Sequence, residues 1–137
     1  MTQRDSELLK ITAAEIGIIS EHNSTDENFQ NSALRPILKL QNDLFIEVFI
    51  QYAIKNKNVF FKLDLSKKQA YIDYALVKDF KFRYFLIGLV VGLFKLNEIK
   101  YYNANSAAVN RRIIAMLAER LKSNLQLLVL NDLADLK

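Results

Sequence analysis

The chain has 137 residues, a formal net charge of +4, 51% hydrophobic and 25% charged residues, and no cysteine. This composition is typical of one globular domain rather than a disordered chain. The lack of thiols excludes disulfides, thiolate metal sites and cysteine nucleophiles. One proline and three glycines leave few residues for tight turns. We therefore expect an all-α fold, a single-domain bundle of four to five helices.

Charge divides the chain into an acidic arm and a basic body. Residues 1–33 carry six acids and two bases, whereas residues 34–123 carry sixteen bases and seven acids. This predicts an N-terminal arm (1–33) that folds over a basic surface of a helical bundle domain (34–137). Within the arm, residues 5–20 suit a short helix, with an extended segment at residues 15–20 as the alternative, and residues 20–33 suit a polar linker anchored by Phe29.

The first long helix is expected from residue 34 to about residue 56, with Pro36 in its first turn. Nearly all of its positions are apolar except one polar stripe that recurs every four residues, at Lys39, Asp43, Glu47, Gln51 and Lys55. A helix this apolar has more than one buried face. It is either central in the fold or shared with a second subunit.

Two capping patterns mark the next helices. Ser66 followed by Gln69 is a capping-box pattern, which predicts a helix that continues to about residue 77. Asp79 is placed to cap a third helix over residues 80–94. Between the first two helices, Val59, Phe60 and Phe61 are expected to pack a short connection onto the core.

Residues 84–94 form an uncharged run that contains Gly88 and Gly92. As a helix it would span roughly 16 Å, too little for a hydrocarbon layer of about 30 Å. We expect it to be the buried spine of the bundle. Each glycine lowers helix propensity by roughly 1 kcal/mol relative to alanine, so both are predicted to contact a neighbouring helix closely, most simply the first one.

The last helices resemble a helix-turn-helix. Residues 96–103 predict a fourth helix, and a fifth begins near Ser106, with an apolar face from Val109 to Leu128; the pattern leaves open whether residues 124–137 continue it. A DNA-binding motif at residues 98–113 would use Lys100, Ser106, Asn110, Arg111 and Arg112. The match is degenerate, because Lys100 replaces a small residue, Asn103 and Asn105 replace apolar ones and Ala104 replaces a glycine.

Catalytic and metal-binding patterns are scarce. His22 is the only histidine, whereas a metal site usually assembles three or four ligands. The glycines are too far apart for a phosphate-binding loop. We expect no metal and no cofactor. An enzyme would instead need a cavity lined by Arg111, Arg112, Tyr101, Tyr102 or a buried carboxylate.

Aromatic and basic residues alternate before the apolar run, at Phe80, Lys81, Phe82, Arg83 and Phe85. A peripheral membrane surface is one interpretation. Because the three phenylalanines cannot share one helical stripe, the favoured interpretation is a core that packs on several sides, with no membrane contact.

Residues 29–43 resemble the opening of an uncharacterised family of small helical bacterial proteins. The likeness continues at residues 78–79, 92–94 and 110–113. Some members of that family carry a glyoxalase label, but one histidine does not supply that enzyme's usual metal site. The resemblance therefore transfers no functional residue.

The function expected from the sequence is non-enzymatic. We predict a cytoplasmic protein-interaction or regulatory module, because the N-terminus lacks a signal-peptide pattern. Homodimerisation is expected from the very apolar first helix and the leucine-rich C-terminal segment. The basic body also suits an acidic protein partner or a nucleic acid. The alternatives are the helix-turn-helix DNA-binding protein and an enzyme or ligand-binding protein with an unrecognised pocket.

Overall fold

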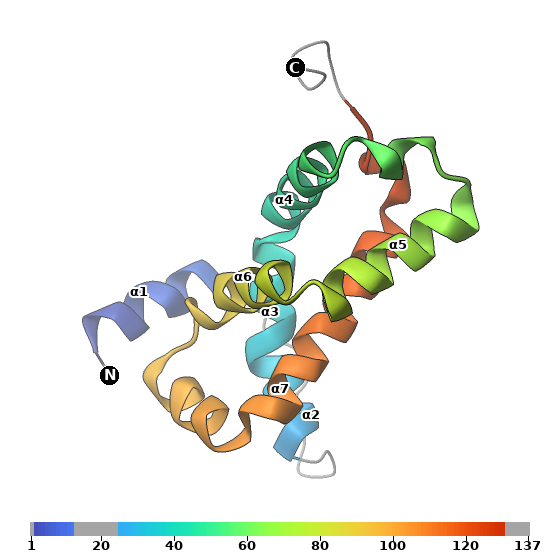
Figure 1. Cartoon of the computed structure of the whole chain (residues 1–137). Coiled ribbons are helices and arrows are strands. Elements are labelled where there is room, and N and C mark those ends of the chain that lie inside the picture. The colour runs from blue at the N-terminus through green and yellow to red at the C-terminus, as the bar shows by residue number, and fades with distance from the viewer. Residues whose placement is uncertain (1, 13–24, 131–137) are drawn as a thin grey trace.

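In the computed structural model, which describes residues 2–12 and 25–130, every regular element is a helix (Figure 1). The α-helices are α1 (Gln3–Thr12), α2 (Thr25–Phe29), α3 (Arg35–Leu40), α4 (Asn42–Lys55), α5 (Leu65–Lys78), α6 (Phe80–Val91) and α7 (Leu96–Ser123). A π-helix, η2 (Gln30–Leu34), joins α2 to α3, and the 3₁₀-helices η3 (Val59–Lys62) and η4 (Leu125–Leu127) follow α4 and α7. The all-α prediction is confirmed, but the helices are shorter and more numerous than expected.

None of the helices in these ranges combines the length and the apolarity needed to cross a membrane.

The core contains an aromatic cluster where α4, η3, α5 and α6 meet. Phe49 of α4 is fully buried, and its ring lies 5.1 Å from that of Phe60 and 6.3 Å from that of Phe82, between ring centres. Tyr52 and Tyr71 also contact Phe49. The predicted packing of Phe60 onto the core is therefore confirmed. This cluster packs between α4, α5 and α6 where these helices meet.

The polar linker expected over residues 20–33 is wrong in its described part, because residues 25–34 are helical. Phe29 is buried against Phe94 and Tyr101, as an anchor would be. The π-helix just before Pro36 has a simple cause. Proline clashes with the carbonyl four residues earlier in a regular α-helix, and the wider turn, in which the Arg35 N–H donates to Gln30 O, relieves the crowding.

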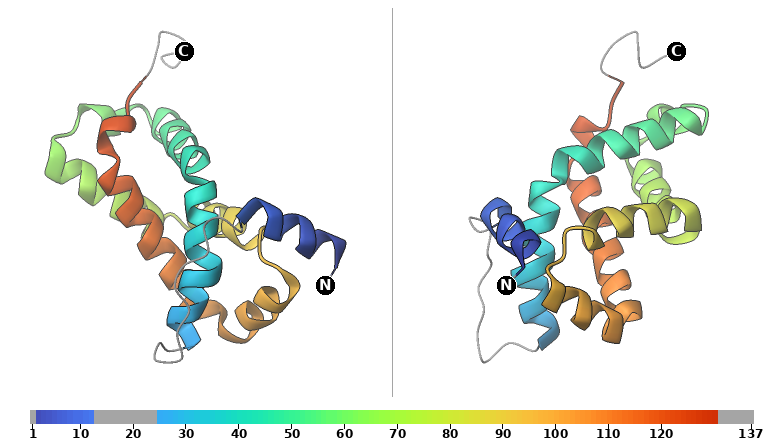
Figure 2. Two further views of the ribbon diagram at one scale, coloured as in Figure 1. Left: turned by 180° about the vertical axis from the view of Figure 1, so that it is seen from behind. Right: turned by 90° about the vertical axis from the view of Figure 1, so that its left-hand side faces the viewer.

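The first long helix is bent rather than continuous. Gln41, between α3 and α4, has φ −92° and ψ 6°, although its N–H still donates to Ile37 O at 2.9 Å. The Gln41 side chain donates to Leu89 O of α6 at 3.3 Å. This tertiary contact stabilises the bend and turns α4 away from the direction of α3 (Figure 2).

The capping predictions have different outcomes. Asp79 caps α6 as expected, with its Oδ1 accepting from Phe82 N at 3.3 Å. The capping box at Ser66 is wrong, because Asp64 caps α5 and accepts from Lys67 N at 3.0 Å. An aspartate in the extended conformation just before the helix accepts from a free first-turn N–H, so the helix begins two residues earlier than the Ser66 pattern predicts.

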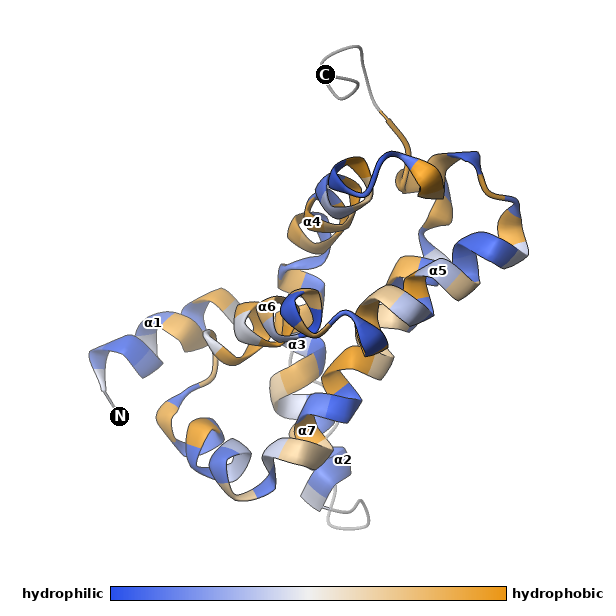
Figure 3. Ribbon diagram, in the orientation of Figure 1, coloured by the Kyte–Doolittle hydropathy of each residue, from blue (hydrophilic) through white to orange (hydrophobic). Residues whose placement is uncertain are grey.

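Helix α6 is buried on one side only, although hydrophobic residues follow it along its length (Figure 3). Leu86, Ile87 and Val90 are buried, whereas Phe80 is 67% and Phe85 is 52% exposed. The predicted spine is therefore half exposed, and the helix ends at Val91. Of the phenylalanines expected to fill a core, only Phe82 does so.

The close contacts predicted for the glycines are also wrong. A Cβ added at Gly88 would meet no atom of a neighbouring element in the described ranges within 4 Å. A Cβ added at Gly92 would meet Gly88 O, one helical turn earlier, at 3.1 Å. No neighbouring helix approaches either glycine closely. The glycines do not mark a packing seam of this fold.

We therefore expect Gly88→Ala to stabilise the protein by about 0.5–1 kcal/mol, because alanine restricts the unfolded chain and fits the open space. Thermal unfolding should show a midpoint about 3 °C higher. Gly92→Ala is the matched control, since its Cβ is crowded by Gly88 O, and it should gain less. A lower melting temperature for Gly88→Ala would contradict this account.

Helix α7 contains the two C-terminal helices that the sequence predicts. They meet at Asn105, the one residue inside α7 with non-helical angles, φ −135° and ψ 28°. The Asn105 side chain donates to Tyr101 O at 2.9 Å, a local bond that competes with the helical ladder. The second half runs alongside α5 (Figure 1). Beyond α7, Leu128 is buried, and residues 131–137 lie outside the described ranges.

Helix α1 holds the α6–α7 connection through two side chains. Arg4 donates to Phe94 O and Gly92 O, both at 2.7 Å, and the Asp5 carboxylate accepts from Leu96 N at 3.1 Å. The cation thus lies on free carbonyls after α6, and the anion lies at the start of α7, as helix dipoles favour. The expected helix is confirmed for residues 5–12, and residues 13–20 lie outside the described ranges.

Candidate functional site

An open groove of about 580 Å³ lies between α4, η3 and α5. A smaller hollow of about 280 Å³ lies between α4 and α6. Tyr52 lines both, so we treat them as one feature, the aromatic groove. Its lining residues are Val48, Gln51, Tyr52, Lys55, Asn56, Val59, Leu63, Lys67, Ala70, Tyr71, Tyr74, Ala75, Phe82 and Phe85.

Tyr52 holds the middle of the aromatic groove in place. Its ring stacks on that of Phe82 with centres 4.0 Å apart, and its hydroxyl donates to Asp79 Oδ2 at 2.7 Å. Burial, followed by the hydrogen bond to Asp79, raises the pKa of the Tyr52 hydroxyl. The phenol therefore stays neutral, and one aspartate both caps α6 and ties it to α4.

The turn after α4 shapes the far end of the aromatic groove. Lys57 and Asn58 adopt left-handed conformations, with φ 67° and 60°, which asparagine tolerates better than most residues. The chain reverses there, so Phe60 enters the core while Val59 remains 47% exposed and lines the groove. A short-range turn thus adds an apolar wall.

Apolar groups at the mouth of the aromatic groove are open to solvent. Tyr74 is 69% exposed and Phe85 is 52% exposed, on either side of Tyr52. Lys55 and Lys67 are the charged residues that line the groove, and both are exposed. Exposed aromatic rings that cluster in this way are enriched at binding surfaces.

The residues predicted for DNA contact lie in different surroundings. Lys100 and Ser106 are exposed, and the Asn110 side chain accepts from the Tyr102 hydroxyl at 2.8 Å inside the bend of α7. Arg111 lines a groove of about 510 Å³ between α5 and α7, whereas Arg112 lines a small cavity beside α2. Successive positions on a helix point about 100° apart, which explains this separation. The lysine expected at a crowded position lies in solvent.

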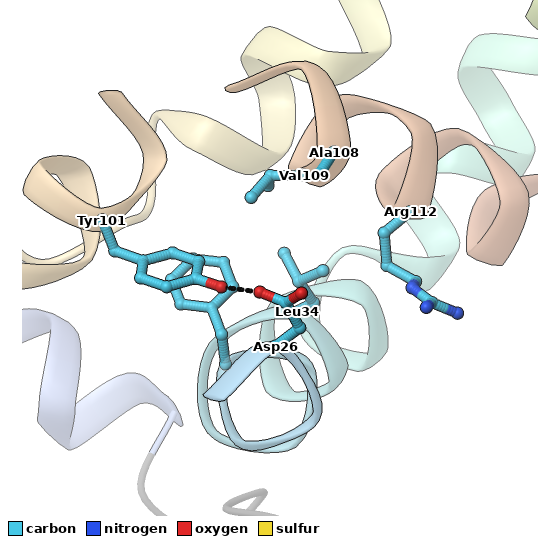
Figure 4. A pocket seen from close by; sticks show the side chains of 7 residues that line it. Asp26, Leu34, Tyr101, Ala108, Val109 and Arg112 are labelled. Carbon is cyan, nitrogen blue, oxygen red and sulfur yellow. Dashed lines mark hydrogen bonds between the residues drawn. The ribbon is translucent and has the colours of Figure 1, made fainter. Parts of the chain in front are cut away.

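Two of the residues expected to line an enzyme's cavity, Tyr101 and Arg112, line the small cavity beside α2. The Tyr101 hydroxyl donates to Asp26, and Arg112 lies on the other side of that carboxylate (Figure 4). Burial, followed by the bond to Asp26, raises the pKa of Tyr101 to about 12. The cavity measures about 70 Å³, smaller than the 300 Å³ or so of small-molecule sites. Tyr102 and Arg111 do not line it.

The buried carboxylates in the described ranges bind backbone N–H groups at the start of α7. Asp5 and Glu98 are the buried ones there. Asp5 binds the first N–H of α7, and Glu98 accepts from Lys95 N at 2.8 Å while pairing with the Lys95 ammonium at 3.1 Å. No group of three potential metal ligands occurs among the described residues. His22 lies outside these ranges.

The sequence pattern missed the aromatic groove almost completely. Tyr52 lies within the apolar pattern of the first predicted helix. No motif or capping pattern marks Tyr71 or Tyr74. A usable signal exists, since Lys67, Tyr71 and Tyr74 recur at spacings of three and four residues on one face of α5. This spacing does not reveal that Lys67 and Tyr74 are exposed whereas Tyr71 is partly buried.

Comparisons with protein-family models, with curated proteins and with solved structures give no match to this chain.

Proposed function

We propose that this protein is a non-enzymatic protein-interaction module that binds a segment of another protein in the aromatic groove. The observation that supports it is the joint exposure of Tyr74 and Phe85 at a groove that shares its lining with the aromatic core. Partly exposed aromatic rings on a rigid floor are the usual anchors of protein interfaces. Rigidity follows from the stacking of Tyr52 on Phe82.

The homodimer expected from the sequence fits this groove poorly. In a two-fold dimer, the same surface meets itself, so Lys55 and Lys67 would face the cations of the second copy. The exposed parts of two or three aromatic rings amount to roughly 300 Å², whereas a stable interface needs about 800 Å² per partner. A different protein that contributes a short segment suits the groove better.

Site-specific photo-cross-linking in the native host tests this function. With a benzophenone amino acid in place of Tyr74, we expect a discrete protein adduct. The same amino acid in place of Ser106, exposed on α7, is the position control. Ala70→Trp, which fills the groove from the exposed side of α5, should abolish the Tyr74 adduct. No adduct at Tyr74, or one that survives Ala70→Trp, would contradict the proposal.

A further inference from the structure

We infer that the segment bound in the aromatic groove is an amphipathic helix with an acidic polar face. This inference rests on the proposed function and names the chemistry of its partner. It follows from three features of the surface around the groove: its unpaired positive charge, its apolar floor and the helical nature of its walls.

Positive charge around the aromatic groove is not neutralised by the acids of the residues that the structure describes. Residues 55–85, which supply most of the groove, contain eight bases and only three acids. Each acid is already engaged: Asp64 caps α5, Asp79 binds Tyr52 and caps α6, and Asp73 pairs with Lys122 at 3.0 Å. Within residues 55–85, the exposed lysines without a carboxylate partner among the described residues are Lys55, Lys57, Lys62, Lys67, Lys78 and Lys81.

The apolar floor determines the conformation of the segment. Val59, Leu63, Ala70 and Ala75 offer no side-chain hydrogen-bond partner to a bound backbone. The walls are helices, which satisfy their own backbone groups and present no sheet edge for strand addition. Asn56, Tyr71 and Tyr74 add polar atoms to the same lining, but a segment laid across the apolar part is best served by satisfying its backbone internally, as a helix does.

The two hollows on either side of Tyr52 determine which side chains of the partner segment are recognised. Apolar side chains on one face of the bound helix enter the hollow beside Tyr74 and the hollow beside Phe85. Acidic residues at the edges of that face then lie near Lys67 and Lys55. The acids of α4 itself, Asp43 and Glu47, lie about three and two turns before Lys55, so the partner's negative charge is expected toward the C-terminal end of α4.

Binding of defined peptides to the full-length protein tests the inference. The probe is a fluorescent amphipathic helix of about 16 residues, with leucine on one face and glutamate on the other. Three control peptides replace glutamate by lysine, place a central proline or scramble the order. Fluorescence anisotropy should show binding of the acidic helix alone, with weaker affinity at higher salt.

Matched variants assign the peptide to the aromatic groove. The double change Lys55→Glu and Lys67→Glu should weaken binding by about tenfold or more, and Ala70→Trp should abolish it. Lys100→Glu, at an exposed lysine on α7, should change the affinity less than about twofold. Circular dichroism and the melting temperature establish that each variant is folded.

Several results would overturn the inference: equal binding of the lysine peptide or of the proline peptide, no binding of the acidic helix, or equal effects of Lys55/Lys67 and Lys100 reversal. Tighter binding of anionic vesicles or single-stranded DNA would also overturn it. If photo-cross-linking at Tyr74 still gives a groove-dependent adduct in those cases, the interaction function stands and only the partner's chemistry is wrong.

Discussion

Replacing Phe49 by alanine is expected to destabilise the protein by about 3–5 kcal/mol. The Phe49 side chain is fully buried and contacts the rings of Tyr52, Phe60, Tyr71 and Phe82. Its removal leaves a cavity where α4, α5 and α6 cross, and close-packed neighbours relax only partly. Because typical domains are stable by about 5–15 kcal/mol, urea unfolding followed by circular dichroism should show a much lower midpoint.

The chain offers a control of the same chemistry. Phe80→Ala also removes one phenylalanine ring, but Phe80 is 67% exposed. Its loss should change the free energy of unfolding by about 0.5 kcal/mol or less. Similar losses for the two variants would show that the aromatic cluster around Phe49 is not the core that positions the groove.

Asp5→Ala is expected to destabilise the protein by about 1–2 kcal/mol, the cost of losing a helix cap. The substitution leaves Leu96 N–H without its acceptor at the start of α7 and removes a carboxylate from the positive end of that helix. It also frees one end of the contact by which α1 holds the α6–α7 connection. Chemical unfolding measures the loss, and faster hydrogen exchange at the Leu96 amide localises it.

Glu7→Ala serves as the control for Asp5→Ala. Glu7 lies on the same helix and pairs with Lys10 at 3.4 Å, but both side chains are largely exposed. Exposed pairs contribute roughly 0–1 kcal/mol, so the melting temperature should barely change. If Asp5→Ala behaved like Glu7→Ala, the contact between α1 and the start of α7 would not stabilise the fold.

The N-terminal arm shows what summed charge leaves open about structure. Net charge predicts an acidic arm that folds over a basic surface, and this stays a prediction. In the described part of that arm, one arginine and one aspartate contact two helix ends. Sequence composition does not reveal which backbone groups are left free at the end of α6 and the start of α7.

Local patterns determined the elements whose causes are local. The apolar spacing of residues 34–56 and of the segment that begins near Ser106, and the cap at Asp79, predicted helices, which the structure contains with altered bounds. Asn105 separates two helical segments as expected. These features depend on residues within about one turn of each other, so one sequence suffices to find them. The same holds for the all-α class.

The aromatic groove depends on contacts between residues far apart in the chain. The Gln41 bend relies on Leu89 O, and Tyr52 meets Asp79 and Phe82 across about 30 positions. Helical spacing identified α6 as apolar, but only the crossing of α4 and α5 decides that Leu86 is buried while Phe85 is exposed. The sequence by itself determined the helices and their charge. The tertiary structure decided which apolar faces remain uncovered, because burial depends on neighbours that local periodicity does not specify.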